Sequence, residues 1–140
     1  MRAGGEGLPV RVDRDRNCFV CGPDNPVGLK VTPEADGRGN AVIRLKVPAT
    51  CQGWQGIVHG GILSTLFDEA AIYACMGRSG GAVTAEMTMR YLKPVPVQTP
   101  IEVRARVVEE RRRKLSVEGE ILLDGAVHAR GQATVLLLKE

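Results

Sequence analysis

The strongest hydrophobic pattern in the chain begins at a pair of glycines, Gly60 and Gly61. Beyond them, apolar residues recur at the three- and four-residue spacing of one helix face. These residues are Ile62, Leu63, Leu66, Phe67, Ala70, Ala71 and Ala74. A glycine-rich stretch at 77–81 ends the pattern. The sequence therefore predicts one amphipathic helix that starts at the two glycines.

Alternating apolar and polar positions predict strands on both sides of this helix. Before the helix, we expect a short strand at 29–33, a turn at 36–40 and a half-buried strand at 41–47. After the helix, strands are expected at 83–92, 101–107, 115–121 and 127–137. One long helix followed by strands at hairpin spacing favours an α+β fold with a mainly antiparallel sheet.

Length and composition favour one domain. With 140 residues, 44% of them hydrophobic, the chain can build a single core. Residues 1–16 are rich in glycine and charge without periodicity, so we expect a flexible leader before a domain at 17–140. No apolar run approaches a bilayer span or a signal core, which leads us to expect a cytoplasmic protein without a membrane partner. The net charge of +3 argues only weakly for nucleic acid, because few aromatic residues are present to stack on bases, and we expect no nucleic-acid partner.

The polar positions of the predicted helix suggest chemistry. Gly60 and Gly61 lie at its start, where backbone N–H groups lack intrahelical partners and attract an anion. Asp68 projects roughly opposite the centre of the apolar stripe, so it points away from the core of its own helix. The alternative explanation of Asp68 and Glu69 is an acidic face exposed to solvent.

The sequence His59-Gly60-Gly61, followed after six residues by Asp68, resembles the hotdog-fold acyl-CoA thioesterases, specifically their phenylacetate-pathway (PaaI-type) branch. The resemblance extends to residues 17–29 and 82–94. It implies a hotdog fold, in which a sheet of five to six strands wraps around one central helix. It also implies hydrolysis of an acyl-CoA thioester, with coenzyme A as part of the substrate and no further cofactor. The resemblance further implies a homodimer, often paired again into a homotetramer.

Thioester hydrolysis needs a donor for the carbonyl oxygen and a group that attacks or activates water. We assign the donor to the Gly60 amide, which Gly61 keeps accessible, and the second role to Asp68 as nucleophile or general base. His59 is expected to orient the thioester or to fix the loop. Eight residues along a helix span about 12 Å, too far for one carbonyl to meet both groups. We therefore predict that each site combines Gly60 of one subunit with Asp68 of another.

The resemblance implies further site residues. Thr84 matches a position that holds a hydroxyl residue in part of the family and would position the water, although an ordinary strand threonine explains it as well. Family members often carry Asn or Gln six residues before the histidine, where this chain has Gly53, and Gln52 or Gln55 would have to replace that side chain. Substrate contacts are expected at Val83, Arg90 and Lys93.

The cysteines do not form an evident metal site. Cys18 and Cys21 are two residues apart, but a four-ligand zinc site would need Cys51 or Cys75 from distant segments. We expect the pair to be structural, buried in a turn rich in glycine and proline, and we expect no metal.

Two charged features and the function itself each allow a second explanation. The basic cluster at 111–114 is either a solvated hairpin turn or a contact to the phosphates of coenzyme A. Glu69 lies about 100° from Asp68 around the helix and is expected to be an interface or structural acid, with a role as the catalytic acid as the alternative. The competing functions are a hotdog hydratase or dehydratase and a non-catalytic protein that binds acyl-CoA or an aromatic ligand.

Overall fold

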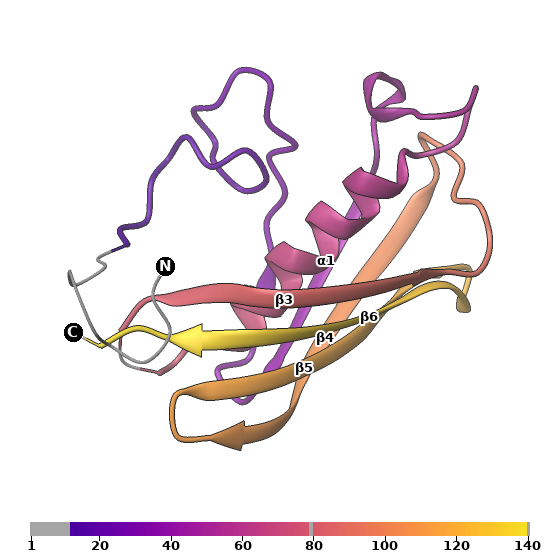
Figure 1. Ribbon diagram of the computed structural model, residues 1–140. Helices are drawn as coiled ribbons and strands as arrows, with labels where there is room; N and C mark the ends of the chain where they lie inside the picture. Colours follow the sequence, from indigo (N-terminus) through magenta and orange to yellow (C-terminus); the bar gives the residue numbers. More distant parts are fainter. Residues whose placement is uncertain (1–11, 79, 140) are drawn as a thin grey trace.

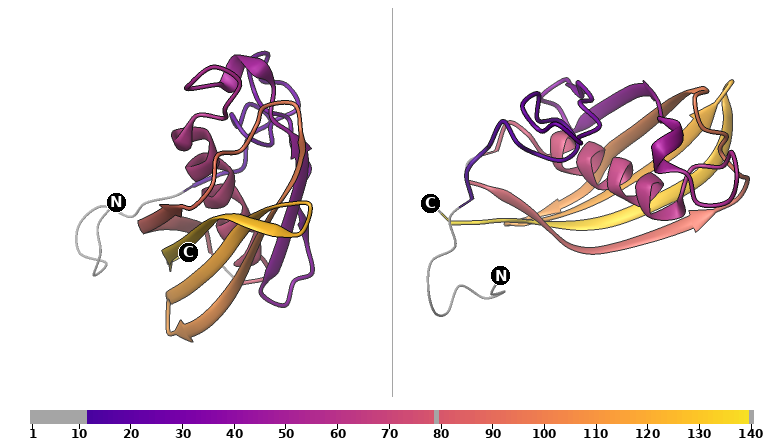
Figure 2. Two further views of the ribbon diagram at one scale, coloured as in Figure 1. Left: turned by 90° about the vertical axis from the view of Figure 1, so that its right-hand side faces the viewer. Right: turned by 90° about the horizontal axis from the view of Figure 1, so that it is seen from above.

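The computed structural model describes residues 12–78 and 80–139, in which one long helix lies against a six-stranded sheet (Figure 1). Views at right angles show the sheet curving around the helix, with the segment before the first strand on the helix side (Figure 2). The strand order is β1-β2-β4-β5-β6-β3, and every neighbouring pair is antiparallel. The elements are β1 (Glu34–Ala35), β2 (Asn40–Lys46), the 3₁₀ helix η1 (Ala49–Cys51), α1 (Gly60–Ala74), β3 (Ala82–Tyr91), β4 (Pro100–Arg111), β5 (Lys114–Leu123) and β6 (Ala126–Leu137).

These elements confirm most of the secondary structure predicted from periodicity. The helix begins at the predicted glycine, and each of the five longer strands begins within one residue of its predicted start. The strand expected at 29–33 is wrong. Leu29 and Val31 instead donate their N–H groups to carbonyls of residues 19–20, at 2.8 and 2.9 Å, and Lys30 between them has a positive φ of 52°. This segment therefore pairs with the preceding turn and not with the sheet.

The core lies between α1 and the concave side of the sheet, with Phe67 fully buried at its centre. Gly119 on β5 and Gly131 on β6 lie opposite each other in the sheet, under the Phe67 ring. A Cβ atom on Gly131 would lie 2.6 Å from that ring, and one on Gly119 would lie 1.9 Å from the carbonyl oxygen of Arg104. The two glycines therefore allow the ring to pack directly against strand backbone.

This packing predicts a large effect of a single methyl group. Gly131→Ala is expected to lower the free energy of unfolding by about 1–3 kcal/mol, because the added carbon overlaps the Phe67 ring. Urea denaturation measures the change. In a Phe67→Leu background the same substitution should cost less, since the smaller side chain leaves room. An equal cost in both backgrounds would show that the Phe67 ring is not what the methyl group meets.

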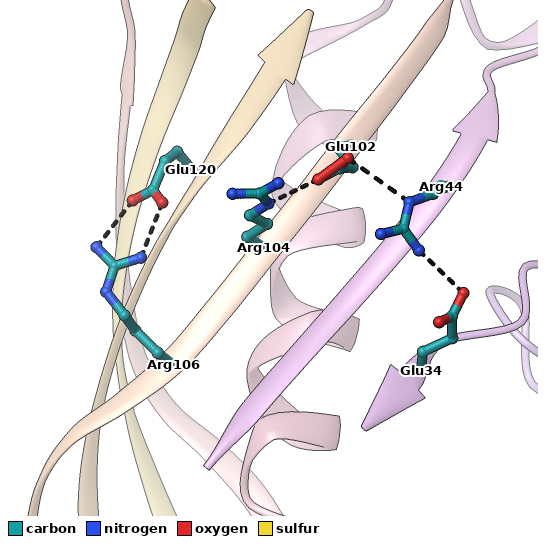
Figure 3. A network of polar contacts seen from close by, with 6 residues as sticks. All are labelled: Glu34, Arg44, Glu102, Arg104, Arg106 and Glu120. Carbon is teal, nitrogen blue, oxygen red and sulfur yellow. Dashed lines mark hydrogen bonds and ion pairs between the residues drawn. The ribbon is translucent and has the colours of Figure 1, made fainter. Parts of the chain in front are cut away.

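The other face of the sheet carries paired charges (Figure 3). Arg44 on β2 lies 3.0 Å from Glu34 and 3.6 Å from Glu102, and Arg106 on β4 lies 2.8 Å from Glu120. Such partly exposed pairs each contribute little to stability. They make this part of the outer face polar.

The predicted leader is described only from residue 12, because residues 1–11 lie outside the described part of the chain. Arg14 donates to the hydroxyl oxygen of Tyr73 at 2.7 Å, and Arg16 pairs with Asp24 at 2.8 Å. The end of the leader thus contacts the domain. Within residues 12–78 and 80–139, α1 and η1 both fall short of the length and apolarity that crossing a membrane requires.

Candidate active site

His59 caps α1 and decides which N–H groups at the helix start are free. Its Nδ1 accepts a hydrogen bond from the Gly61 N–H at 2.9 Å. Its carbonyl oxygen accepts from Ile62 at 2.9 Å and from Leu63 at 3.3 Å. The Gly60 N–H has no partner among the described residues. It is therefore the one N–H group in the first turn that a ligand can use without breaking another hydrogen bond.

The loop before the helix is fixed by its own contacts. The Gln52 side-chain oxygen accepts from the Gly56 N–H at 2.9 Å, so Gln52 holds the loop that carries His59. A Cβ atom on Gly53 would lie 3.3 Å from Cδ2 of His59. The glycine therefore leaves room for the histidine ring, which is a physical reason for the absence of a larger side chain at this position.

Asp68 lies two turns beyond Gly60 on α1 and is half-buried. Thr84 on β3 donates its hydroxyl to Oδ1 of Asp68 at 2.5 Å. A β-bulge follows Thr84, between Thr84 and Glu86 in the pairing with β6. The structure thus brings Asp68 and Thr84 together. Asp68 itself lies about 12 Å along the helix from Gly60.

Tyr91 of β3 and Ser64 of α1 also lie where the helix faces this strand, and the sequence did not indicate a role for either residue. The Tyr91 hydroxyl donates to the Gly60 carbonyl oxygen at 3.0 Å and lies 2.5 Å from the Ser64 hydroxyl. Helical spacing places Ser64 near Asp68, but Tyr91 is 27 residues from Ser64 in the chain. No local pattern reveals that contact. Thr84 and Tyr91 lie at opposite ends of β3. Thr84 contacts Asp68, and Tyr91 contacts Gly60, so β3 holds both candidate catalytic groups of α1.

The three expected substrate contacts are separated by the structure. Thr84 faces α1, so strand alternation turns the adjacent Val83 toward the other side of the sheet. Arg90 is exposed on β3 next to the inward-facing Tyr91, and alternation turns it away from the helix as well. Lys93 lines a cavity of about 250 Å³ that also includes Gly60. Of the three, Lys93 is the one that lies at the helix start within a single chain.

Two further cavities border the helix start. One of about 400 Å³ is lined by Gly53, Trp54, Val58, His59 and Gly60. The other is a cleft of about 820 Å³ on the side of α1 away from β3. Its walls are largely apolar, and they include Phe19, Val27 and Leu29 of the N-terminal turn and Ile62 of the helix, with Gln52, His59 and Gly61 at the helix start. The cleft is large enough for an apolar group of moderate size.

Comparison with known proteins identifies the family to which the chain belongs. Residues 55–127, which run from the loop before α1 into β6, match the thioesterase superfamily and make up more than half of the chain. The chain belongs to the thioesterase superfamily. The predicted hotdog fold and the resemblance to hotdog thioesterases are both confirmed.

Individual relatives of this superfamily member agree with that assignment. Acyl-coenzyme A thioesterase THEM4 of Rattus norvegicus is 33% identical over 88 residues, which are 63% of this chain and 38% of the rat protein. The chain therefore spans well under two thirds of that relative. The crystal structure of the thioesterase superfamily protein RHA08564 has a TM-score of 0.77 and 26% identity, covering 89% of this chain and 61% of that one. The structure of a mutant of phenylacetic acid degradation protein PaaI from Thermus thermophilus has a TM-score of 0.72 and 30% identity, covering 77% of this chain and 93% of that one.

The basic cluster at 111–114 lies at the opposite end of the helix from Gly60. It forms the turn between β4 and β5, and Arg113 donates to the carbonyl oxygen of Leu138 at 2.9 Å. Arg78, just beyond α1, pairs with Glu110 at 2.9 Å. Within one chain of this superfamily member, the cluster therefore lies away from the helix start.

Glu69 faces the N-terminal turn, where it meets Cys18 and Cys21. One ligand atom from each of the three residues lies within 4.8 Å of the other two. Burial raises the pKa of Glu69, and burial together with a hydrogen bond to Glu69 raises the pKa of Cys21 to about 12. A thiol with a raised pKa is a poor nucleophile, which argues against redox chemistry at Cys21. Among the described residues, these three are the group of cysteine, histidine and acidic side chains that lie close enough together to hold a metal ion.

Proposed function

We propose that this chain hydrolyses acyl-CoA thioesters, with the Gly60 N–H as oxyanion donor and Asp68 as nucleophile or general base. The observation that carries the proposal is the unpartnered Gly60 N–H at the positive end of the α1 dipole, which meets no acceptor among the described residues. A donor fixed before the reaction stabilises the negative charge that develops on the thioester oxygen. The name of the rat relative, an acyl-coenzyme A thioesterase, supports the same substrate class.

The edge strand β3 offers a way for Gly60 and Asp68 to meet across two subunits. β3 ends the sheet, so its outer edge has no strand beside it within the described chain. Two β3 strands paired antiparallel about residues 87–88 would place Thr84 opposite the partner's Tyr91, because positions across an antiparallel pair have a constant sum. Thr84 holds Asp68, and Tyr91 holds Gly60.

One such dimer would build two identical sites, each with Asp68 from one subunit and Gly60 from the other. The same edge-to-edge pairing would satisfy the free backbone groups of β3. Pairing of two dimers into a tetramer and a cytoplasmic location stay predictions.

In each site, the thioester carbonyl oxygen accepts a hydrogen bond from the Gly60 N–H. Asp68 of the other subunit either attacks the carbonyl carbon or takes a proton from the water that attacks. The carbon–sulfur bond then breaks, and the coenzyme A thiolate leaves and takes up a proton. If Asp68 attacks, one water then hydrolyses the mixed anhydride and restores the carboxylate. Thr84 keeps Asp68 oriented in either route, and the acyl group would occupy the cleft of about 820 Å³.

A panel of acyl-CoA substrates, aliphatic and aromatic, tests the proposal through release of free thiol. We expect turnover of at least one member, with one thiol released per acid formed. Binding of coenzyme A esters without thiol release would contradict the proposal and favour a non-catalytic binding protein. Loss of enoyl-CoA absorbance without thiol release would favour a hydratase.

A further inference from the structure

The N-terminal turn is built around the sulfur of Cys18. The Val20 N–H donates to Cys18 Sγ at 3.4 Å, and the Gly22 N–H donates to the Cys18 carbonyl oxygen at 2.9 Å. A Cβ atom on Gly22 would lie 2.4 Å from the Cys18 nitrogen, so no larger residue fits there. Cys18 and Cys21 have the spacing that supplies two ligands of a zinc site, and an N–H donated to sulfur favours the thiolate.

A third ligand comes from α1. Glu69 brings a carboxylate oxygen within 4.8 Å of both sulfur atoms. Zinc–sulfur bonds of about 2.3 Å at tetrahedral angles hold two sulfurs about 3.8 Å apart, so a shift of about 1 Å closes the site. Oε2 of Glu69 is buried and has no hydrogen-bond partner among the described residues. A buried carboxylate oxygen without a partner is unfavourable, and a bound cation would satisfy it.

Tyr73 and Arg14 surround these ligands with donors. The Tyr73 hydroxyl donates to Cys21 Sγ at 3.4 Å, and Arg14 donates to the Tyr73 oxygen at 2.7 Å. The Arg14 guanidinium also lies 5.5 Å from the centre of the Tyr73 ring. Two thiolates and one carboxylate bound to a divalent cation form a site with one net negative charge. The Arg14 guanidinium places a positive charge next to that site. Outer contacts of this kind orient metal ligands and tune their affinity.

We propose that Cys18, Cys21 and Glu69 bind one Zn²⁺ ion, as two thiolates and a carboxylate, with water in the fourth position. Binding releases the two thiol protons. Thiolate ligands favour zinc over magnesium or calcium, which prefer oxygen. The proposal replaces the expectation of no metal, which was based on the positions of the cysteines and did not consider Glu69 as a ligand.

The role of this ion is structural. It ties the turn at 17–29 to α1, and Phe19, Val27 and Leu29 of that turn form one wall of the cleft of about 820 Å³. The ion would therefore hold this wall against the helix. The inference is independent of the proposed hydrolysis, since zinc binding is measured without substrate.

Untagged protein, purified under reducing conditions without chelator, tests the site. We expect about one zinc per chain by inductively coupled plasma mass spectrometry. Removal by a strong chelator should lower the melting temperature by about 5 °C or more, and added zinc should restore it. Cobalt in place of zinc should give the charge-transfer absorption of cobalt–thiolate bonds. Reduced wild-type protein that takes up neither metal, or a Cys18–Cys21 disulfide in freshly isolated protein, would overturn the proposal.

Variants assign the ligands. Cys18→Ser and Cys21→Ser should each reduce bound zinc at least about tenfold, and Glu69→Gln should weaken zinc affinity about 10- to 100-fold and change the cobalt spectrum. Cys51→Ser is the matched control, because Cys51 is also partly buried but lies outside the cluster, and it should bind zinc like the wild type. Unchanged affinity and spectrum in Glu69→Gln would remove Glu69 from the site and overturn the proposal. If a cysteine variant does not fold, chelation of the wild type still decides.

Discussion

Asp68→Asn is expected to lower kcat for thioester hydrolysis by at least about 100-fold, with the fold and ligand binding largely intact. The substitution keeps the shape of the side chain and its contact with the Thr84 hydroxyl, but it removes the negative charge. An amide neither attacks a carbonyl carbon nor accepts a proton from water at neutral pH. Steady-state kinetics on the best substrate of the panel, with circular dichroism as the check on folding, measure the effect.

The matched control is Asp124→Asn, which removes the same charge from the turn between β5 and β6. Asp124 is exposed and has a positive φ of 49°, a conformation that Asn tolerates, so kcat should stay within about twofold of the wild type. Glu69→Gln tests the neighbouring acid. Retained activity in Asp68→Asn together with loss in zinc-loaded Glu69→Gln would move the catalytic role one residue along the helix.

Periodicity was sufficient to predict the helix and the long strands, because each buries one face against the common core. It failed at 29–33, where Leu29 and Val31 look like strand residues. Their backbone partners are the carbonyls of residues 19–20, in a turn stabilised by its own hydrogen bonds. A local apolar pattern indicates that a segment is buried but not which backbone it pairs with, and here the partner was a turn and not the sheet.

The candidate site, too, could be predicted only in part from the sequence. The positions of Gly60 and Asp68 on one helix follow from local spacing, and so does the distance that separates them. The contacts that hold them do not, because Thr84 and Tyr91 reach the helix from the two ends of β3. The meeting of Glu69 with Cys18 likewise depends on how the N-terminal turn folds over α1. Long-range contacts of this kind leave no periodic trace in a single sequence.

The availability of the Gly60 N–H also depends on a detail that spacing does not reveal. A histidine before a helix can orient a ligand or fix the loop that leads into the helix, and both roles were left open for His59. In the structure its Nδ1 caps Gly61, which fixes the remaining ring proton on Nε2. The histidine thus selects Gly60 as the free donor and presents a second donor, its Nε2–H, at the same end of the helix.

Mixing two inactive variants is expected to restore about a quarter of the wild-type sites, if each site takes Gly60 from one subunit and Asp68 from the other. The first variant is Asp68→Asn. The second is Gly60→Pro, which removes the N–H from the first helical position, where proline is tolerated. His59 before it already has the extended conformation that a following proline requires, with φ −60° and ψ 135°. Gly60→Ala, which keeps the N–H, is the matched control and should stay active, since its Cβ atom would meet the Tyr91 ring at an ordinary 3.5 Å.

After random subunit exchange in an equal mixture, about half of the dimers contain one subunit of each kind. In such a heterodimer one site carries both substitutions and the other carries neither, so half of its sites are intact. Hydrolysis of the best acyl-CoA substrate measures the recovery, and native mass spectrometry confirms the heterodimers. Recovery near a quarter requires the two groups to act on one thioester from different chains. Confirmed heterodimers without recovered activity would show that Gly60 and Asp68 serve the same site within one chain, or that one of them takes no part in the reaction.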